Sequence, residues 1–361
     1  MKGKLLRVLP FTKSESMKKG SWSFLYSYNL RIVRDIFVYC SREEIKEAKL
    51  YEAMVDNIIP PPKDKWVYSR NKKKERLQLE YVHAAKYLGF ITREDETLRP
   101  DFSGFRQEKL TILEENRNRT FSPNNKSPPF TMREKSSMLK IVLGYERARD
   151  FLRWFLDFSR FKDIYSFDDS LFRINAQPIC ILGKIRKEKK GREILKREID
   201  GQIWKIPENK PNDYIRIVSF VFPSWFKDLG LIDEVIVFPE FSDDGELWHM
   251  YFPVRMSDED SLRLNISEFL ESLFMEEETN RLWTPYIIFA MAKKYHCSVK
   301  AIKRGIENAY RQNYGHFYFE RTPAHLMKPF YKDSYIEIGG FYRSYLSRIK
   351  VKENGKKRTH R

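Results

Sequence analysis

The sequence predicts an α+β fold with a mainly helical N-terminal half, a middle part that contains β-strands, and several small β-hairpins. Three observations predict it. Apolar residues recur at helical spacing in several stretches before residue 160, runs of β-branched and aromatic residues become frequent after residue 170, and Gly stands between helical and strand-like segments. With 361 residues, 42% of them hydrophobic and 15% aromatic, the chain can form two or three folded domains.

Two helices are expected near the N-terminus, one in NLRIVRDIFVYC and one in SREEIKEAKLYEAMVDNI, which together cover residues 29–58. Ser41 followed by Glu44 has the pattern of a capping box, in which the first residue caps a helix and the Glu side chain bonds back to it. The second helix should therefore begin at Ser41. The three Pro residues at 60–62 should end it.

A third helix is expected over residues 72–88, because its apolar side chains lie at helical spacing. Gly89 follows at the position where a helix often ends with a left-handed residue, and a short hairpin should come next. These elements form a predicted N-terminal domain over residues 1–112. The polar and Pro-rich residues 113–130 then predict a linker or mobile loop.

A middle domain is expected over residues 131–265, with a helical hairpin followed by β-rich segments. Thr131 and Glu134 have the capping-box pattern, and Gly144 divides the hairpin. The runs PICILG, YIRIVSFVF and VIVFPEF have the composition of strands, and the Asp-Asp-Gly sequence at 243–245 predicts a hairpin turn.

Two short helical patterns separated by a tight turn lie in MAKKYHCSVKAIKRGI. Ala292 is small enough for the second helix to cross close above it, and Ser298 can cap that helix. Ile302 and Ile306, four residues apart, would form its buried face. This spacing resembles the helix-turn-helix signature of the DNA-binding family, which usually has Gly at the turn, where this chain has His296.

Two strand-like segments, GHFYFERTP and YIEIGG, follow this pair of helices. The order of helix, turn, basic helix and hairpin resembles a winged helix, which implies a C-terminal winged-helix domain over residues 266–342. AAKYLGFI (84–91) and FKDLGLI (226–232) resemble the junction before the wing in that family, so the fold is interpreted as tandem winged-helix-like modules. The same junction also occurs in many unrelated α/β proteins. Residues 343–361, with eight basic residues and one Glu, predict a basic tail.

The formal net charge is +17, from 67 basic and 50 acidic side chains, and such an excess repels itself in a compact state unless an anion neutralises it. Nucleic acid is the expected partner, with DNA favoured over RNA, and protein partners are expected as well. A membrane surface, an acidic protein or a generally basic proteome are the alternatives. Three widely spaced Cys residues without a CxxC pair indicate a reducing, cytoplasmic location, and no apolar run has the length of a membrane span.

The candidate nucleic-acid-binding residues are four groups of basic side chains and one helix cap. Ser298 would cap the second helix of the helix-turn-helix. That helix would present Lys300, Lys303 and Arg304 to a groove. The wing, the front of the third helix and a projecting loop would contact phosphates, with solvated surface charge as the alternative in each case. Their basic residues are Arg321, Lys328 and Lys332; Lys72, Lys73, Lys74 and Arg76; and Arg186, Lys187, Lys189, Lys190 and Arg192.

The sequence contains no Walker A motif, no GxGxxG after a strand and no GxSxG, and none of its six His residues is paired at metal-ligand spacing. No catalytic residue, metal or cofactor is therefore expected. Asp233, Glu234 and Glu240 flank the strand-like VIVFPEF, but Ser242 stands where a metal-dependent nuclease would place Lys.

The sequence thus favours a non-enzymatic protein that binds nucleic acid, above all double-stranded DNA. It would act as the recognition subunit of a larger assembly in defence, replication or repair, or alone as a regulator. Two alternatives stay open. One is a protein–protein scaffold that uses winged helices, with acidic segments at 258–260 and 276–278 for a basic partner. The other is a metal-dependent DNA endonuclease whose active site has no recognisable motif.

Overall fold

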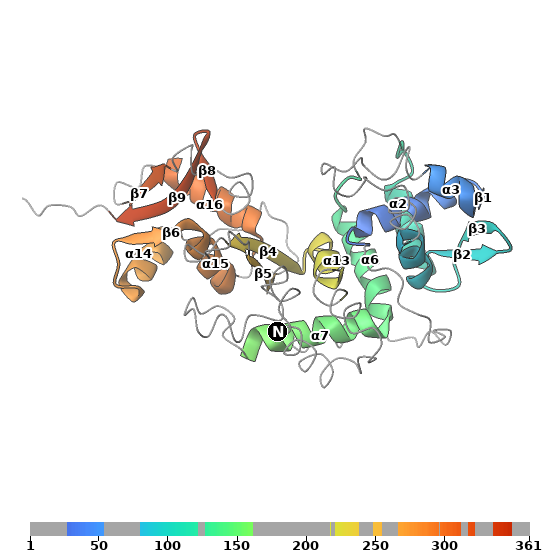
Figure 1. The fold of residues 1–361 in the computed structure, drawn as a ribbon, viewed down its shortest axis with the longest axis horizontal. Coiled ribbons are helices and arrows are strands. Elements are labelled where there is room, and N and C mark those ends of the chain that lie inside the picture. Colours follow the sequence, from blue (N-terminus) through green and yellow to red (C-terminus); the bar gives the residue numbers. More distant parts are fainter. Residues whose placement is uncertain are drawn as a thin grey trace, which may run out of the picture. The chain divides into compact units, whose positions relative to one another are not determined.

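The structure is a computed structural model, and its fold is shown in Figure 1. It describes residues 27–53, 80–121, 127–161, 217, 221–237, 248–254, 266–295, 297–311, 317–321 and 335–348. The chain forms two compact units: unit 1 comprises residues 1–161 and 189–232, and unit 2 comprises residues 162–188 and 233–361. Helices and small antiparallel sheets occur in the described part of the chain, which confirms the predicted α+β class.

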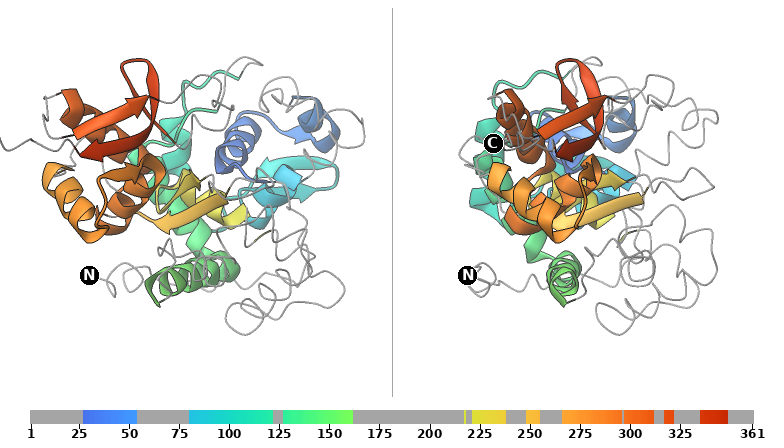
Figure 2. Two further views of the ribbon diagram at one scale, coloured as in Figure 1. Left: turned by 60° about the vertical axis from the view of Figure 1, so that its left-hand side comes forward. Right: turned by 90° about the vertical axis from the view of Figure 1, so that its left-hand side faces the viewer.

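The first part of unit 1 begins with a helix and ends with a β-hairpin. Its elements are α2 (Leu30–Cys40), β1 (Ile45–Lys46), α3 (Glu47–Ala53), a helix over residues 80–87, β2 (Ile91–Glu94) and β3 (Thr97–Pro100). The three strands form one antiparallel sheet in the order β1-β3-β2, so the last strand lies in the middle. α2 packs against this sheet through β3 (Figure 2).

Longer helices follow in unit 1. They are α5 (Arg106–Glu115), α6 (Met132–Gly144), α7 (Glu146–Phe161) and α13 (Phe222–Asp228). The ring of Phe151 on α7 packs against Phe155, Phe222 and Phe226 with centroid distances of 5.9, 5.3 and 5.8 Å. All four rings are fully buried, so aromatic packing joins α7 to α13.

Unit 2 repeats the order of helix, strand, two helices and hairpin. Its elements are α14 (Ile266–Glu276), β6 (Arg281–Trp283), α15 (Thr284–Tyr295), α16 (Val299–Arg311), β7 (Phe317–Arg321), β8 (Ile336–Ile338) and β9 (Phe341–Arg348). The strand order is β6-β9-β7, and β8 pairs with the start of β9, so the last strand again lies in the middle. A separate pair of strands, β4 (Ile232–Val237) and β5 (Trp248–Pro253), precedes these elements.

Two helix ends share the junction that the sequence echo predicts. Gly89 and Gly230 have φ angles of +62° and +73°, a backbone conformation that favours Gly. In each case the residue after Gly donates its N–H to a carbonyl five residues earlier, from Phe90 to Ala85 and from Leu231 to Phe226, both at 2.9 Å. These are the bonds of a Schellman motif, which ends the helix and turns the chain into a strand.

The helix predicted to begin at Ser41 is a correction. Ser41 instead ends α2, where its Oγ donates to the carbonyl of Val38 at 2.7 Å, and the next helix begins only at Glu47. The residues between them form β1, because Ile45 is buried and pairs with Leu98 of β3. A sheet partner more than fifty residues away therefore overrides a local capping pattern.

The predicted basic tail begins too early. β9 runs to Arg348, so residues 343–348 belong to the sheet, and residues 349–361 lie outside the described part. Leu346 explains this, because it is fully buried and pairs with Leu282 on one side and Phe319 on the other. Among the other predicted elements, the capping box of Thr131 is confirmed at the start of α6.

Candidate nucleic-acid interface

α16 has one buried and one exposed face, as the sequence predicts. Ile302 and Ile306 are fully buried and pack toward the interior of unit 2. Lys300 and Arg304 are exposed, and Lys303 is half-buried. The basic side chains therefore lie on the side of the helix that faces away from the core, where a ligand can reach them.

The N-terminus of α16 is capped by two side chains. Ser298 Oγ accepts a hydrogen bond from the N–H of Ala301 at 3.2 Å, which confirms the predicted cap. Asp233 Oδ2 accepts from the N–H of Val299 at 2.8 Å, and its other oxygen accepts from the N–H of Glu234 at 2.8 Å. Sequence reasoning considered Asp233 only as a nuclease carboxylate, but its two oxygens are used to fix the strand and the helix start.

The preceding helix supports α16 from inside unit 2. Ala292 of α15 is fully buried, as expected for a small residue beneath a crossing helix, and α15 packs against α16. Cys297, between the two helices, is buried, and burial raises the pKa of its thiol to about 11. The thiol is therefore neutral at physiological pH and acts as a packing group. His296, at the predicted turn, lies outside the described residues.

Arg321 lies at the end of β7, as expected for a wing residue, and is exposed. Its guanidinium carbon is 3.2 Å from the centroid of the Phe341 ring at the start of β9. The remaining predicted residues lie outside the described part of the chain: Lys72, Lys73, Lys74, Arg76, Arg186, Lys187, Lys189, Lys190, Arg192, Lys328 and Lys332. Their role stays a prediction.

Unit 1 contains a buried network of charged side chains that sequence reasoning missed. Arg34 of α2 donates from Nε to Asp35 at 3.0 Å and from Nη1 to Glu134 of α6 at 3.2 Å, and these three side chains are 2% exposed or less. Asp35 also accepts from Arg119 at 2.6 Å and from the hydroxyl of Ser127. Two cations thus meet two anions, so the network is neutral and ties α2 to α6 and to the segment between α5 and α6.

That segment was predicted as part of a linker. Its described residues contribute buried side chains to unit 1, including Asn116 and Ser127. Asn116 Nδ2 donates to Glu134 at 2.6 Å and to the carbonyl of Ile112 at 2.8 Å. A polar composition here serves buried hydrogen bonds, and nothing in the composition alone separates that use from a solvated loop.

A second buried cation fixes the hairpin of unit 1. Lys109 of α5 is 1% exposed, and its Nζ donates to the carbonyls of Gly89 and Asp101, both at 2.6 Å. These two residues flank the hairpin of β2 and β3. Burial lowers the pKa of Lys109, and the nearby Asp101 opposes that shift.

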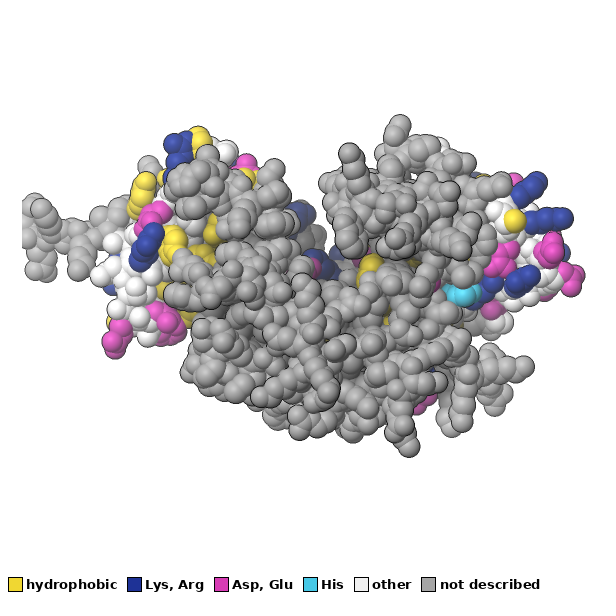
Figure 3. All heavy atoms as spheres, viewed as in Figure 1, with side chains coloured by type: hydrophobic (Ala, Val, Ile, Leu, Met, Phe, Trp, Pro, Cys, Tyr) yellow, Lys and Arg dark blue, Asp and Glu magenta, His cyan; other side chains and the backbone are white. Residues whose placement is uncertain are grey.

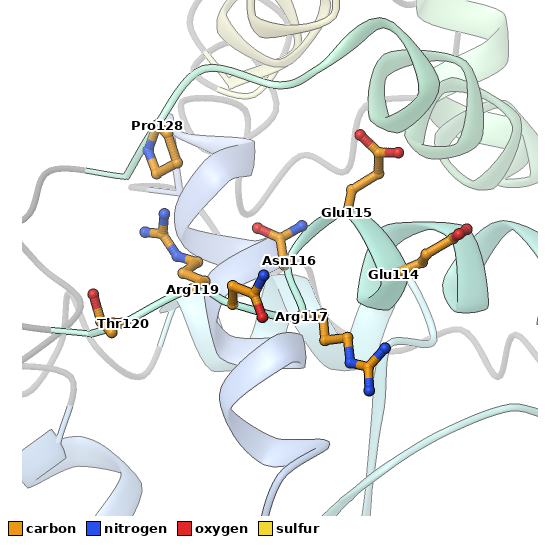
Figure 4. A pocket seen from close by; sticks show the side chains of 8 residues that line it. Glu114, Glu115, Asn116, Arg117, Arg119, Thr120 and Pro128 are labelled. Atoms are coloured by element: carbon orange, nitrogen blue, oxygen red, sulfur yellow. The ribbon is translucent and has the colours of Figure 1, made fainter.

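An open pocket of about 400 Å³ lies beside the network and is shown in Figure 4. It is lined by Glu114, Glu115, Asn116, Arg117, Asn118, Arg119, Thr120 and Pro128. Figure 4 shows Arg117 and Arg119 pointing in opposite directions. Arg133 pairs with Glu114 at 3.0 Å and with Glu115 at 2.8 Å. The charges of the wall are thus engaged in ion pairs within unit 1.

Among the described residues, no group of three or more His, Cys, Asp or Glu side chains is arranged to hold a metal ion. Glu240, the third carboxylate of the nuclease alternative, lies outside those residues. Within the same part of the chain, no helix combines the length and the apolar character that a membrane span requires. No family model matches the chain, and no similar curated protein or solved structure was found.

Proposed function

We propose that both units are winged-helix-like modules and that the chain binds double-stranded DNA, with α16 as its reading helix. The observation that carries the proposal is the exposed basic face of α16, formed by Lys300, Lys303 and Arg304, on a helix whose opposite face is buried. A helix of this kind can enter the major groove with its N-terminal half toward the bases.

The order of elements supports the same proposal. In both units a helix, a strand, two helices and a hairpin follow one another, and the last strand pairs with the first and the second. A winged helix needs this arrangement, because the sheet closes one side of the helices and carries the wing. In unit 1 the helix at 80–87 takes the place of α16.

The overall charge of +17 supports a polyanionic ligand. Lys and Arg side chains that neutralise phosphates release condensed counterions, which makes binding strong at low salt and weaker as salt rises. Binding alone suits either a regulator or the recognition subunit of a larger assembly. The two differ in whether a second polypeptide copurifies with the chain from its native source.

The first prediction tests α16 directly. Lys303→Ala combined with Arg304→Ala should reduce the affinity for a labelled duplex about tenfold or more, because two contacts to groove or phosphate are lost. The slope of log K against log salt should become shallower by about 2. Fluorescence anisotropy between about 50 and 200 mM salt measures both quantities.

A matched control removes the same two charges from another helix. Arg133 and Lys140 of α6 are exposed and pair with Glu side chains, so Arg133→Ala with Lys140→Ala lowers the net charge equally. Neither double variant should change the free energy of unfolding by more than about 1 kcal/mol. Equal DNA affinity in the two double variants would remove α16 from the interface. Weak binding without salt dependence would favour the protein scaffold.

A further inference from the structure

The sheet of unit 2 has one buried and one exposed face. Phe317, Phe319 and Leu346 are buried, and Tyr310 of α16 packs edge-on against Phe319 with ring centroids 5.6 Å apart. Side chains alternate between the two faces along a strand. The residues next to these buried ones therefore point away from α16.

The strand register brings the outward residues of three strands together. Tyr318 lies opposite Ser347, Glu320 lies opposite Tyr345, and Arg281 of β6 also lies opposite Ser347. The same face continues toward the turn between β8 and β9. We name it the outer sheet face and define it by Arg281, Tyr318, Glu320, Arg321, Phe341, Arg343 and Tyr345.

Guanidinium groups and aromatic rings alternate on the outer sheet face. The guanidinium carbon of Arg321 lies 3.2 Å from the ring centroid of Phe341, and that of Arg281 lies 3.8 Å from the ring centroid of Tyr345. Arg281 also forms an ion pair with Glu320 at 2.6 Å. These contacts hold the cations flat against the sheet, where they form a platform with the rings.

The platform is both apolar and cationic, and it is accessible. Tyr318 is 52% exposed and Phe341 is 45% exposed, which makes them two of the few large exposed hydrophobic residues in the described part of the chain. The face carries three Arg residues against one Glu. In Figure 3 basic and hydrophobic side chains lie next to each other over the hairpin of β8 and β9. Exposed apolar surface of this kind marks an interaction site.

We propose that the outer sheet face binds single-stranded nucleic acid by stacking unpaired bases on its rings and guanidinium groups. A single strand matches both properties of the face at once, because each base offers a flat π-surface and each phosphate a negative charge. An acidic protein would satisfy the charge, but it would leave the flat aromatic surfaces without a matching partner.

This inference goes beyond duplex binding and rests on different residues. α16 packs on the buried face of the sheet through Tyr310, whereas the stacking residues lie on the opposite face. One unit would thus offer separate surfaces to paired and unpaired nucleic acid. The two activities can therefore be separated by mutation.

The second prediction tests this surface in the full chain. Tyr318→Ala combined with Phe341→Ala should weaken binding of a labelled oligothymidylate of about 16 nucleotides tenfold or more, because two stacking surfaces are lost. Binding of a labelled duplex should not change. Tyr318→Phe with Phe341→Trp keeps both rings and should retain single-strand binding. An oligouridylate of the same length shows whether the face distinguishes RNA from DNA.

The control is Met275→Ala on α14, which removes a 70% exposed apolar side chain from elsewhere in unit 2 and should leave single-strand affinity intact. Lys303→Ala with Arg304→Ala should do the same, even if that variant no longer binds duplex. The proposal is overturned if the chain does not bind the oligothymidylate, or if the ring-deleted variant binds it equally well. It is also overturned if that variant loses only self-association, since a second copy would then cover the face.

Discussion

In unit 1 the ion pairs that join the helices are buried, whereas in unit 2 the ion pairs of the sheet stand on its exposed face. Arg34 and Asp35 of unit 1 have fully buried side chains, while Arg281 and Glu320 of unit 2 are 55% and 29% exposed. Yet both units have the same order of elements and the same position for the last strand. The topology therefore does not depend on the charges, which distinguish how each unit is held together from what each can bind.

This contrast has a physical basis. Buried opposite charges must be paired almost perfectly, because each costs several kcal/mol to remove from water, and they fix the positions of the elements that carry them. Exposed pairs contribute little to stability, because water screens them, but they remain available to a ligand. Charges of unit 1 are thus used for internal order, and those on the sheet of unit 2 can serve an interface.

The largest effect expected from this contrast compares two isosteric substitutions. Asp35→Asn leaves Arg34 and Arg119 without their shared carboxylate in the interior and should lower the free energy of unfolding by about 3–5 kcal/mol. Glu320→Gln removes an exposed partner and should cost about 1 kcal/mol or less. Denaturant unfolding measures both, and hydrogen exchange should show early opening of α2 and α6 only in the first. Similar costs for the two variants would contradict the comparison.

A carboxylate of unit 1 also predicts a pH effect of intermediate size. Asp228 accepts from the N–H of Leu30 at 3.0 Å and pairs with Arg31, but burial raises its pKa from 3.8 to about 6. The folded state then binds this proton more tightly than the unfolded state does. The free energy of unfolding should therefore fall by about 2–3 kcal/mol as pH rises from about 4 to 6, and stay level above that.

Asp228→Asn should remove that slope, which denaturant unfolding of both proteins from pH 4 to 8 measures. Glu320 of unit 2 provides the opposite sign, because its hydrogen bond from Arg281 lowers its pKa, so its contribution is lost as pH falls. An unchanged slope in the Asp228 variant would show that another group titrates.

The smallest effect separates backbone strain from packing. Gly89 and Gly339 have nearly the same φ, +62° and +61°, but a Cβ at Gly89 would lie 2.7 Å from Tyr145 Oη, while a Cβ at Gly339 would meet nothing within 4 Å. Gly339→Ala should cost about 1 kcal/mol through strain alone. Gly89→Ala should cost about 1 kcal/mol more, because the Tyr145 side chain must shift. Thermal unfolding measures the difference, and equal costs would place the whole effect in the backbone.

The sequence alone determined the features that depend on neighbours within one or two turns. Ser298 caps α16, Ile302 and Ile306 lie on its buried face, and Thr131 with Glu134 starts α6, because caps and helical spacing act between residues three or four apart. Gly89 ends its helix for the same reason, since only a left-handed residue closes the final hydrogen bonds there.

Only the tertiary structure decided the features that join distant parts of the chain. β1 is two residues long and exists because Ile45 pairs with Leu98, and β9 was hidden in a basic segment because its strand character depends on Leu282 and Phe319. Asp233 became a helix cap only because its strand reaches α16, 66 residues further on. Strand pairing and long-range hydrogen bonds have no fixed spacing in sequence, so no local pattern announces them.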